Sequence, residues 1–331
     1  MIKQFLNHIH RHQLCKTSDK ILLAVSGGVD SMVMLDLFTK AGFQTAVAHC
    51  NFLLRGEASY ADESFVREKC ASMGHPFFSA RFETARIASG NNTSIQETAR
   101  ELRYNFFRDV MDQNGFDLLA TAHQLNDNLE TVLLNLTRGT GLDGISGIPV
   151  RNGKIIRPLL FASREMILGY ASGYRLGWRE DASNDGDDYS RNFVRHHVVP
   201  RLKDINPNLE NTFRDSIERI SSGTSIAGEA LSLFFREAVV ENDGRITLVK
   251  KAVQEHPFRE TALWEFLKKY GFHYDVCKQI LRDHQPGKRF YAADWVLTID
   301  RDVYMIEKGV SGTPEPVIIG SVQARGFFSG M

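Results

Sequence analysis

The chain has 331 residues, of which 43% are hydrophobic and 24% charged, a globular composition that excludes a largely disordered protein. The 40 basic and 40 acidic residues balance, so the net charge neither announces nor excludes a nucleic-acid partner. The length favours two domains. No apolar run is long enough to cross a bilayer and the N-terminus has no apolar signal core, so we expect a cytoplasmic protein.

Strands and helices alternate through the first half of the chain. Four short apolar runs, 21–25, 45–49, 76–82 and 117–122, have the pattern of buried strands. The segments 32–38, 57–73, 94–111 and 126–136 have apolar residues at helical spacing. This alternation predicts an α/β fold with a Rossmann-like parallel sheet. The carboxyl ends of its strands would share one edge, where open α/β sheets bind ligands.

The pattern changes in the second half of the chain. The segments 208–239, 258–270 and 274–283 have helical spacing, and 290–307 alternates like a hairpin. Because Ile205-Asn206-Pro207 punctuates the chain, we expect a first domain over 1–210 and a second over 211–331. The second domain should be smaller and mainly helical.

A glycine-rich loop follows the first predicted strand and opens a helix. Its glycines allow backbone N–H groups to approach phosphate oxygens, and the helix adds its positive end. The loop has no lysine, so it is not the G-x-x-x-x-G-K-[ST] loop. The competing reading is a chance turn of small residues, which six positions in a strand–loop–helix setting disfavour. These positions are Ser26, Gly27, Gly28, Val29, Asp30 and Ser31. They resemble the S-G-G-x-D-S loop of PP-loop ATP pyrophosphatases, which split ATP into AMP and pyrophosphate.

Further motifs narrow this resemblance. H-C-N at 49–51 precedes L-R-G-E at 54–57, and R-E-L-R-Y stands at 100–104. A-H-Q-L-N-D-N-L-E-T follows at 122–131, R-G-T-G at 138–141, I-R-P-L-L at 156–160 and R-N-F-V-R at 191–195. In this order they resemble the motifs of tRNA(Ile)-lysidine synthetases, from about residue 20 to 205.

The resemblance implies a reaction and its partners. ATP with Mg²⁺ would adenylate the C2 oxygen of the wobble cytidine in tRNA(Ile) with a CAU anticodon, and pyrophosphate would leave. L-lysine would then attack C2 and release AMP, which gives lysidine. The second domain, which carries lysines and aromatic residues, would bind tRNA. The sequence leaves the oligomeric state open, a homodimer included.

The resemblance also implies roles for particular residues. Asp30, Asp127 and His123 would be catalytic, and the two aspartates would hold the metal. Nucleotide contacts would come from the loop and from His49, Arg138 and Gly139. Glu130 would bind the lysine ammonium and Arg195 the lysine carboxylate. Arg55, Arg103 and Arg191 would contact substrate phosphates.

Each of these residues also has a purely structural interpretation. Asp127 could simply cap a helix, Asp30 could complement a helix dipole, and the two histidines could close strand ends. The arginines could be solvated surface charges.

Two features depart from the family pattern or remain open. Asn126 occupies the first position of the usual Asp-Asp pair, and we expect restoring Asp there to change activity only modestly. The family's further C-terminal domain is expected to be absent or truncated. The arginines between residues 157 and 201, including Arg175 and Arg179, are expected to contact tRNA, unless they pair with the acidic residues among them.

Three rival functions are weighed on chemical grounds. A tRNA thiolase would need a catalytic cysteine pair or an iron–sulfur ligand set, whereas Cys15, Cys50, Cys70 and Cys277 form no C-x-x-C motif and read as reduced thiols. An amidotransferase-type synthetase would need a glutaminase domain. A nucleotide-binding regulatory module would hold ATP without releasing pyrophosphate.

Overall fold

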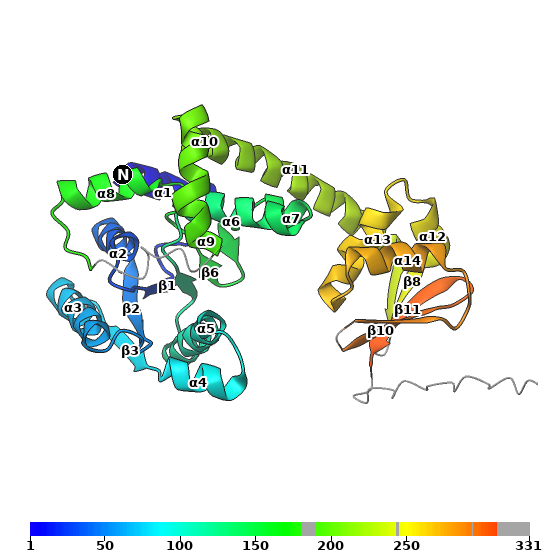
Figure 1. Ribbon diagram of the computed structural model, residues 1–331, viewed down its shortest axis with the longest axis horizontal. Coiled ribbons are helices and arrows are strands. Elements are labelled where there is room, and N and C mark those ends of the chain that lie inside the picture. Colours follow the sequence, from blue (N-terminus) through cyan, green and yellow to red (C-terminus); the bar gives the residue numbers. More distant parts are fainter. Residues whose placement is uncertain (180–189, 243–244, 293, 310–331) are drawn as a thin grey trace, which may run out of the picture. The chain divides into compact units, whose positions relative to one another are not determined.

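The computed structural model describes residues 1–179, 190–242, 245–292 and 294–309 (Figure 1). The chain divides into two compact units, Met1–Thr224 and Ser225–Met331. The division falls within the helix α11 (Leu209–Ala238). Among the described residues, no helix is both long and apolar enough to span a membrane.

The first unit is built on a six-stranded sheet with the order β3-β2-β1-β4-β6-β5. The strands are β1 (Lys20–Ala24), β2 (Gln44–Asn51), β3 (Phe77–Arg81), β4 (Leu118–Ala120), β5 (Arg151–Asn152) and β6 (Ile155–Ile156). All neighbours pair in parallel except β5 and β6. The predicted parallel α/β sheet is therefore confirmed, with a short antiparallel strand at one edge.

Helices cover both faces of this sheet. They are α1 (Ile2–Arg11), α2 (Val29–Ala41), α3 (Glu57–Met73), α4 (Thr84–Asn91), α5 (Ile95–Asn114), α6 (Leu125–Arg138), α7 (Leu142–Ile145), α8 (Arg164–Gly173), α9 (Ser190–Phe193) and α10 (Val199–Ile205). A π-helical turn, Val194–Val198, joins the last two. Alternate residues of β1 pack into different layers: Leu23 packs with α1, α2 and α8, and Leu22 packs against α5.

The second unit contains more strand than its sequence pattern indicated. Its helices are α12 (Lys250–Glu255), α13 (Arg259–Leu267), a short 3₁₀ turn (Lys268–Tyr270) and α14 (Tyr274–Arg282). They accompany an antiparallel sheet with the order β7-β8-β11-β10-β9. Its strands are β7 (Val239–Asn242), β8 (Arg245–Val249), β9 (Arg289–Ala292), β10 (Trp295–Ile299) and β11 (Val303–Lys308). The segment 290–307, predicted as a hairpin, covers β9, β10 and β11, and its β10–β11 pair is a hairpin in which Thr298 faces Met305.

The two strands at the start of this sheet were missed because they are short. β8 shows only two inward positions, Ile246 and Leu248, and β7 follows directly on a long helix. The domain boundary also differs from the expected residue 210. Because α11 runs without a break from Leu209 to Ala238, Ile205-Asn206-Pro207 marks the start of a helix, and the division between units falls after Thr224.

Candidate active site

The glycine-rich loop lies between β1 and α2, as the sequence predicted. Gly27 has φ of 99°, and a Cβ placed on it would lie 3.3 Å from Val66 Cγ2, so only glycine fits without strain. The Gly27 N–H donates to Ser31 Oγ at 3.1 Å, and the Ser31 hydroxyl donates to the Gly28 carbonyl at 2.8 Å. α2 begins without a side-chain cap, so its first-turn N–H groups are left for an anion.

The loop opens into a cavity of about 420 Å³ at the carboxyl ends of β1, β2 and β4. This volume is typical of small-ligand sites, which span roughly 300–1,000 Å³. Its polar lining includes the loop, Asp30, Asp127, His123 and Arg191. The other lining residues are Ala24, Val25, Ala48, Cys50, Phe52, Arg103, Tyr104, Phe107, Thr121 and Ala122. The cavity therefore combines an anion-binding loop with aromatic side chains.

Asp30 lies in the first turn of α2 and faces Arg164, one of the arginines between residues 157 and 201 that were expected to contact tRNA. Arg164 Nη1 lies 3.0 Å and 3.3 Å from the two carboxylate oxygens of Asp30. Burial raises the pKa of Asp30 to about 6, while Arg164 opposes the rise and the charge of Asp127 adds to it. The two aspartates are thus close enough to interact electrostatically.

Asp127 serves a structural and a cavity-facing role with different oxygens. Its Oδ2 accepts the Gln124 N–H at 3.0 Å, within a capping box that starts α6. Its Oδ1 lies 3.4 Å from Arg191 Nη2 and 3.6 Å from Arg195 Nη2. Gln124 is the N-cap of α6, so Asp127 is not the N-cap itself but supports the cap from the third helical position with one oxygen, while the other oxygen lies near Arg191.

Glu130 is buried, with 2% of its surface exposed, and two arginines occupy its carboxylate. Arg195 donates to both oxygens through Nε at 2.7 Å and Nη2 at 2.9 Å, and Arg191 Nε donates at 2.9 Å. In the structure Glu130 therefore orients arginines. Its expected contact with the lysine ammonium, and that of Arg195 with the lysine carboxylate, remain predictions, and both would require these ion pairs to rearrange.

The two histidines of the motifs differ in accessibility. His123 lines the cavity, and its Nδ1 lies 3.0 Å from Thr121 Oγ1. Burial, followed by the charges of Arg157 and Arg191, lowers the pKa of His123 to about 4, so the ring is neutral at pH 7. His49 is 3% exposed and donates from Nδ1 to the Val25 carbonyl at 2.9 Å. It supports the strand end that leads into the loop and is not among the residues that line the cavity.

Of the remaining residues predicted to bind ATP or tRNA, some line the cavity and others do not. Arg103 lines the cavity, and its guanidinium lies 5.2 Å from the centre of the Phe52 ring. Arg55 pairs with Asp62 at 2.6 Å. Arg138 and Gly139 are exposed at the C-terminal end of α6, about 16 Å along the helix axis from Asp127. The structure therefore does not bring them to the cavity, because α6 points them away from it.

Most arginines expected on a tRNA surface are engaged in the first unit. Arg157 is 7% exposed and donates to the Pro149 carbonyl at 2.6 Å. Arg179 Nε pairs with Asp62 at 2.8 Å, and its N–H donates to the Gly27 carbonyl at 2.9 Å. Arg164, Arg191 and Arg195 likewise pair with Asp30, Asp127 and Glu130, so these arginines already have partners within the first unit. The contact of part of this segment with tRNA stays a prediction. The acidic residues at 180–189 lie outside the described residues.

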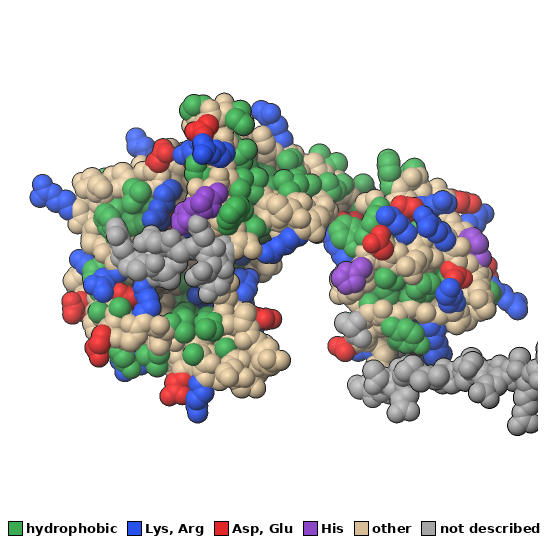
Figure 2. Space-filling model, in the orientation of Figure 1, with side chains coloured by type: hydrophobic (Ala, Val, Ile, Leu, Met, Phe, Trp, Pro, Cys, Tyr) green, Lys and Arg blue, Asp and Glu red, His purple; other side chains and the backbone are tan. Residues whose placement is uncertain are grey.

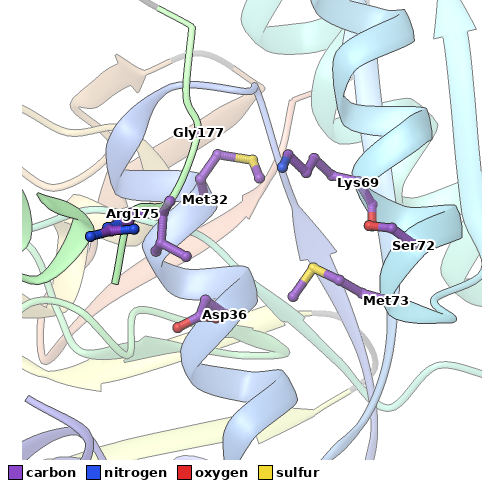
Figure 3. A pocket seen from close by; sticks show the side chains of 8 residues that line it. Met32, Asp36, Lys69, Ser72, Met73, Arg175 and Gly177 are labelled. Carbon is purple, nitrogen blue, oxygen red and sulfur yellow. The ribbon is translucent and has the colours of Figure 1, made fainter. Parts of the chain in front are cut away.

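Arg175 lies beside a second, smaller cavity of about 130 Å³ between α2 and α3 (Figure 3). Figure 3 shows its guanidinium directed away from Lys69, so the two cations do not converge on one point. The carboxylate of Asp36 in this cavity accepts from Tyr170 Oη at 2.7 Å and pairs with Lys40. The glycine-rich loop, Asp30 and Asp127 line the larger cavity and are not among the residues that line this one.

Comparisons with known proteins identify the family to which this chain is related. Residues 1–202 match the family described as PP-loop domain, and residues 241–309 match the TilS substrate binding domain. A tRNA(Ile)-lysidine synthase of Parabacteroides distasonis is 40% identical over 92% of this chain and 70% of that protein. The chain belongs to the tRNA(Ile)-lysidine synthase family.

A second relative and one solved structure are also similar to this chain. The tRNA(Ile)-lysidine synthase of Chlorobaculum tepidum is 44% identical over 73% of this chain and 73% of that protein. Among solved structures, the U34-tRNA thiolase NcsA of Methanococcus maripaludis superposes with a TM-score of 0.52 at 19% identity, over 66% of this chain and 78% of that one. At that identity the likeness supports the fold alone.

Asn126, the departure from the family pattern, holds three segments together. Its Nδ2 donates to Glu210 Oε1 at 3.1 Å, and its Oδ1 accepts the Arg164 N–H at 2.9 Å. The amide therefore ties the start of α6 to the starts of α8 and α11. An aspartate could keep the second contact but not the first.

We expect Asn126→Asp to lower the free energy of unfolding by about 1–3 kcal/mol, because a carboxylate would replace the donor facing Glu210. Urea unfolding measures the change. In a Glu210→Gln background the same substitution should cost less than half as much, since the glutamine amide can donate to the new carboxylate. Equal costs in both backgrounds would contradict the assignment.

The raised pKa of Asp30 predicts a pH dependence. Below its pKa of about 6, protons compete with Mg²⁺ for the carboxylate, so the Mg²⁺ affinity of the protein with a non-hydrolysable ATP analogue should fall about tenfold per pH unit. Calorimetric titration between pH 5 and 8 measures this affinity. In Asp30→Asn, the only pH dependence left should be the one caused by protonation of the ATP analogue itself. Identical pH profiles would exclude Asp30 as a ligand.

The raised pKa of Asp30 also makes the free energy of unfolding depend on pH. The folded state holds the proton of Asp30 more tightly than the unfolded chain, whose ordinary value is 3.8. The stability from this group is therefore greatest below about pH 4 and is lost as the pH rises through about 6. A metal or a phosphate-bound cation would offset that loss.

Proposed function

We propose that this chain ligates L-lysine to C2 of the wobble cytidine of tRNA(Ile) with a CAU anticodon, and that ATP is consumed to AMP and pyrophosphate. The observation that carries the proposal is one cavity that joins the glycine-rich loop, Asp30 and Asp127. Membership of the tRNA(Ile)-lysidine synthase family supplies the substrate class. These substrates place the activity in the cytoplasm.

The loop and the helix start would bind the terminal phosphates of ATP. The free N–H groups of the first turn of α2 suit the β- and γ-phosphates. The aromatic side chains of Phe52, Tyr104 and Phe107 suit a nucleobase, and Arg103 beside them can stack on a base or meet a phosphate. This orientation would place the α-phosphate near Asp127 and His123.

The first chemical step would adenylate the RNA. The C2 oxygen of cytidine forms a bond to the α-phosphorus, the bond between the α-phosphorus and the bridging oxygen breaks, and pyrophosphate leaves. Arg191 lines the cavity and stands where it could compensate charge that develops on the phosphate. The loop would hold the leaving pyrophosphate.

The second step would transfer the base to lysine. The lysine amine loses a proton and attacks C2, and the bond between C2 and the adenylated oxygen breaks, so that AMP leaves with that oxygen. Neutral His123 and the carboxylate of Asp127 line the cavity and could each accept this proton. The carboxylate of Asp127 is also placed to attract the lysine ammonium.

The donor set fits Mg²⁺. Mg²⁺ in nucleotide sites takes one or two carboxylates together with phosphate oxygens and water, and Asp30 and Asp127 face one cavity. Within the described part of the chain, no group of three or more His, Cys, Asp or Glu residues could hold a metal alone, so the phosphates would complete the coordination. Bound there, Mg²⁺ would neutralise phosphate charge.

A thiolase function is not favoured. Burial raises the pKa of the thiols of Cys15, Cys50 and Cys277 to about 12 and of Cys70 to about 11, so they are protonated at neutral pH. Cys50 alone among them lines the cavity.

The protein, ATP, labelled lysine and bulk tRNA should yield AMP, pyrophosphate and lysine bound covalently to RNA. We expect Asp127→Asn to lower this turnover by at least a hundredfold, which corresponds to about 2.7 kcal/mol of barrier. The free energy of unfolding should change by less than about 1 kcal/mol. Asp112→Asn, which removes an exposed carboxylate of α5, is the matched control. Formation of ADP and phosphate in place of AMP, or full activity of Asp127→Asn, would sink the proposal.

A further inference from the structure

The helical segment from α9 through the π turn to α10 has two faces with different chemistry. Its inner face carries Asn192, Val194 and Val199, which are at most 9% exposed, and the two valines pack with Leu129 of α6. Arg191 and Arg195 on the same side hold Glu130. These contacts fix the orientation of the segment against the cavity wall.

The outer face presents aromatic rings. Phe193 is 53% exposed, and its ring centre lies 4.8 Å from that of His197 at 41°. The His197 ring in turn lies 6.5 Å from His196. Figure 2 shows histidine side chains at the surface between the positions that Figure 1 labels α9 and α10. The three rings therefore form an exposed aromatic surface, Phe193–His196–His197, with Phe193 as its largest member.

Two features set this surface apart from a scattered exposed side chain. Its two histidines lie on the π-helical turn that follows Phe193, and such turns are rare and frequently found at functional sites. It also lies next to the cavity, because Arg191, two residues before Phe193, lines the cavity from the inner face of the same helix. A helix is about 10 Å across, so the surface lies close enough to the cavity for a nucleotide that adjoins a base held there to reach it.

We propose that the Phe193–His196–His197 surface stacks the base that adjoins the wobble cytidine in the RNA strand. Exposed aromatic side chains hold splayed bases of single-stranded RNA by stacking, which contributes about 1–3 kcal/mol per base. The arginines beside it are balanced by Glu130 and Asp127, so the surface offers ring faces and little net charge. The proposal rests on the proposed function, because it takes the wobble cytidine as the occupant of the cavity.

An anticodon stem-loop with a fluorescent aminopurine in place of the adenine that follows the wobble cytidine tests the proposal. Stacking quenches this probe. With the wild type and Phe193→Tyr we expect quenching on binding, whereas Phe193→Ala and Phe193→Leu should lose it and bind the loop about tenfold more weakly. Leu136→Ala, also at a 53% exposed position, is the control and should bind like the wild type.

Salt titration separates stacking from phosphate contacts. The slope of log affinity against log salt should be the same for Phe193→Ala and the wild type, because no counterion release is lost. Unchanged affinity and quenching in Phe193→Ala would overturn the proposal, as would full recovery by Phe193→Leu, which would indicate an apolar contact with a protein partner. Failure of the wild type to attach lysine would refute the proposed function instead, while the binding data would still report on the surface.

Discussion

The buried carboxylate of Glu130 organises the site. It accepts three hydrogen bonds from Arg191 and Arg195 at 2.7–2.9 Å, and Nη2 of each arginine also lies 3.4–3.6 Å from Asp127 Oδ1. Breaking such a buried pair by removing one partner is strongly destabilising, because the other charge is left uncompensated. One carboxylate therefore fixes the helix at α9 to α6 and sets the charge environment of Asp127.

Charge balance explains how Asp30 and Asp127 can face one cavity before nucleotide arrives. Arg164 lies on Asp30, and Arg191 and Arg195 lie near Asp127, so each carboxylate has a counter-charge. Burial still raises the pKa of Asp30 to about 6, which shows that the balance is incomplete. A nucleotide with its cation would replace these ion pairs, and the arginines would then be free to meet phosphate oxygens.

Motifs tied to local backbone geometry could be predicted from the sequence. The loop from Ser26 to Ser31, the parallel strands that lead to it and the helix expected over 94–111 follow from short-range rules, and the structure has each of them. Contacts between residues that are far apart in the sequence were harder to predict. The partner of Asp30 is Arg164, 134 residues away, and no spacing rule connects them.

Helix direction and burial account for the remaining differences. Arg138 belongs to the same motif region as Asp127, yet α6 carries it away from the cavity. Glu130 follows Asp127 by one helical turn and was expected to face substrate, but it is buried among arginines that the sequence placed on other ligands. In the second unit, β7 and β8 were too short for their alternation to stand out.

The fate of the cytidine oxygen tests the account most directly. A tRNA transcript that carries a heavy oxygen isotope at C2 of the wobble cytidine can be reacted with ATP and lysine, and the nucleotide products can be weighed by mass spectrometry. The account predicts that the label appears in AMP and in no other product, because the C2 oxygen attacks the α-phosphorus and departs with it. Label that stays in the RNA after lysine attachment, or that appears in pyrophosphate, would contradict it.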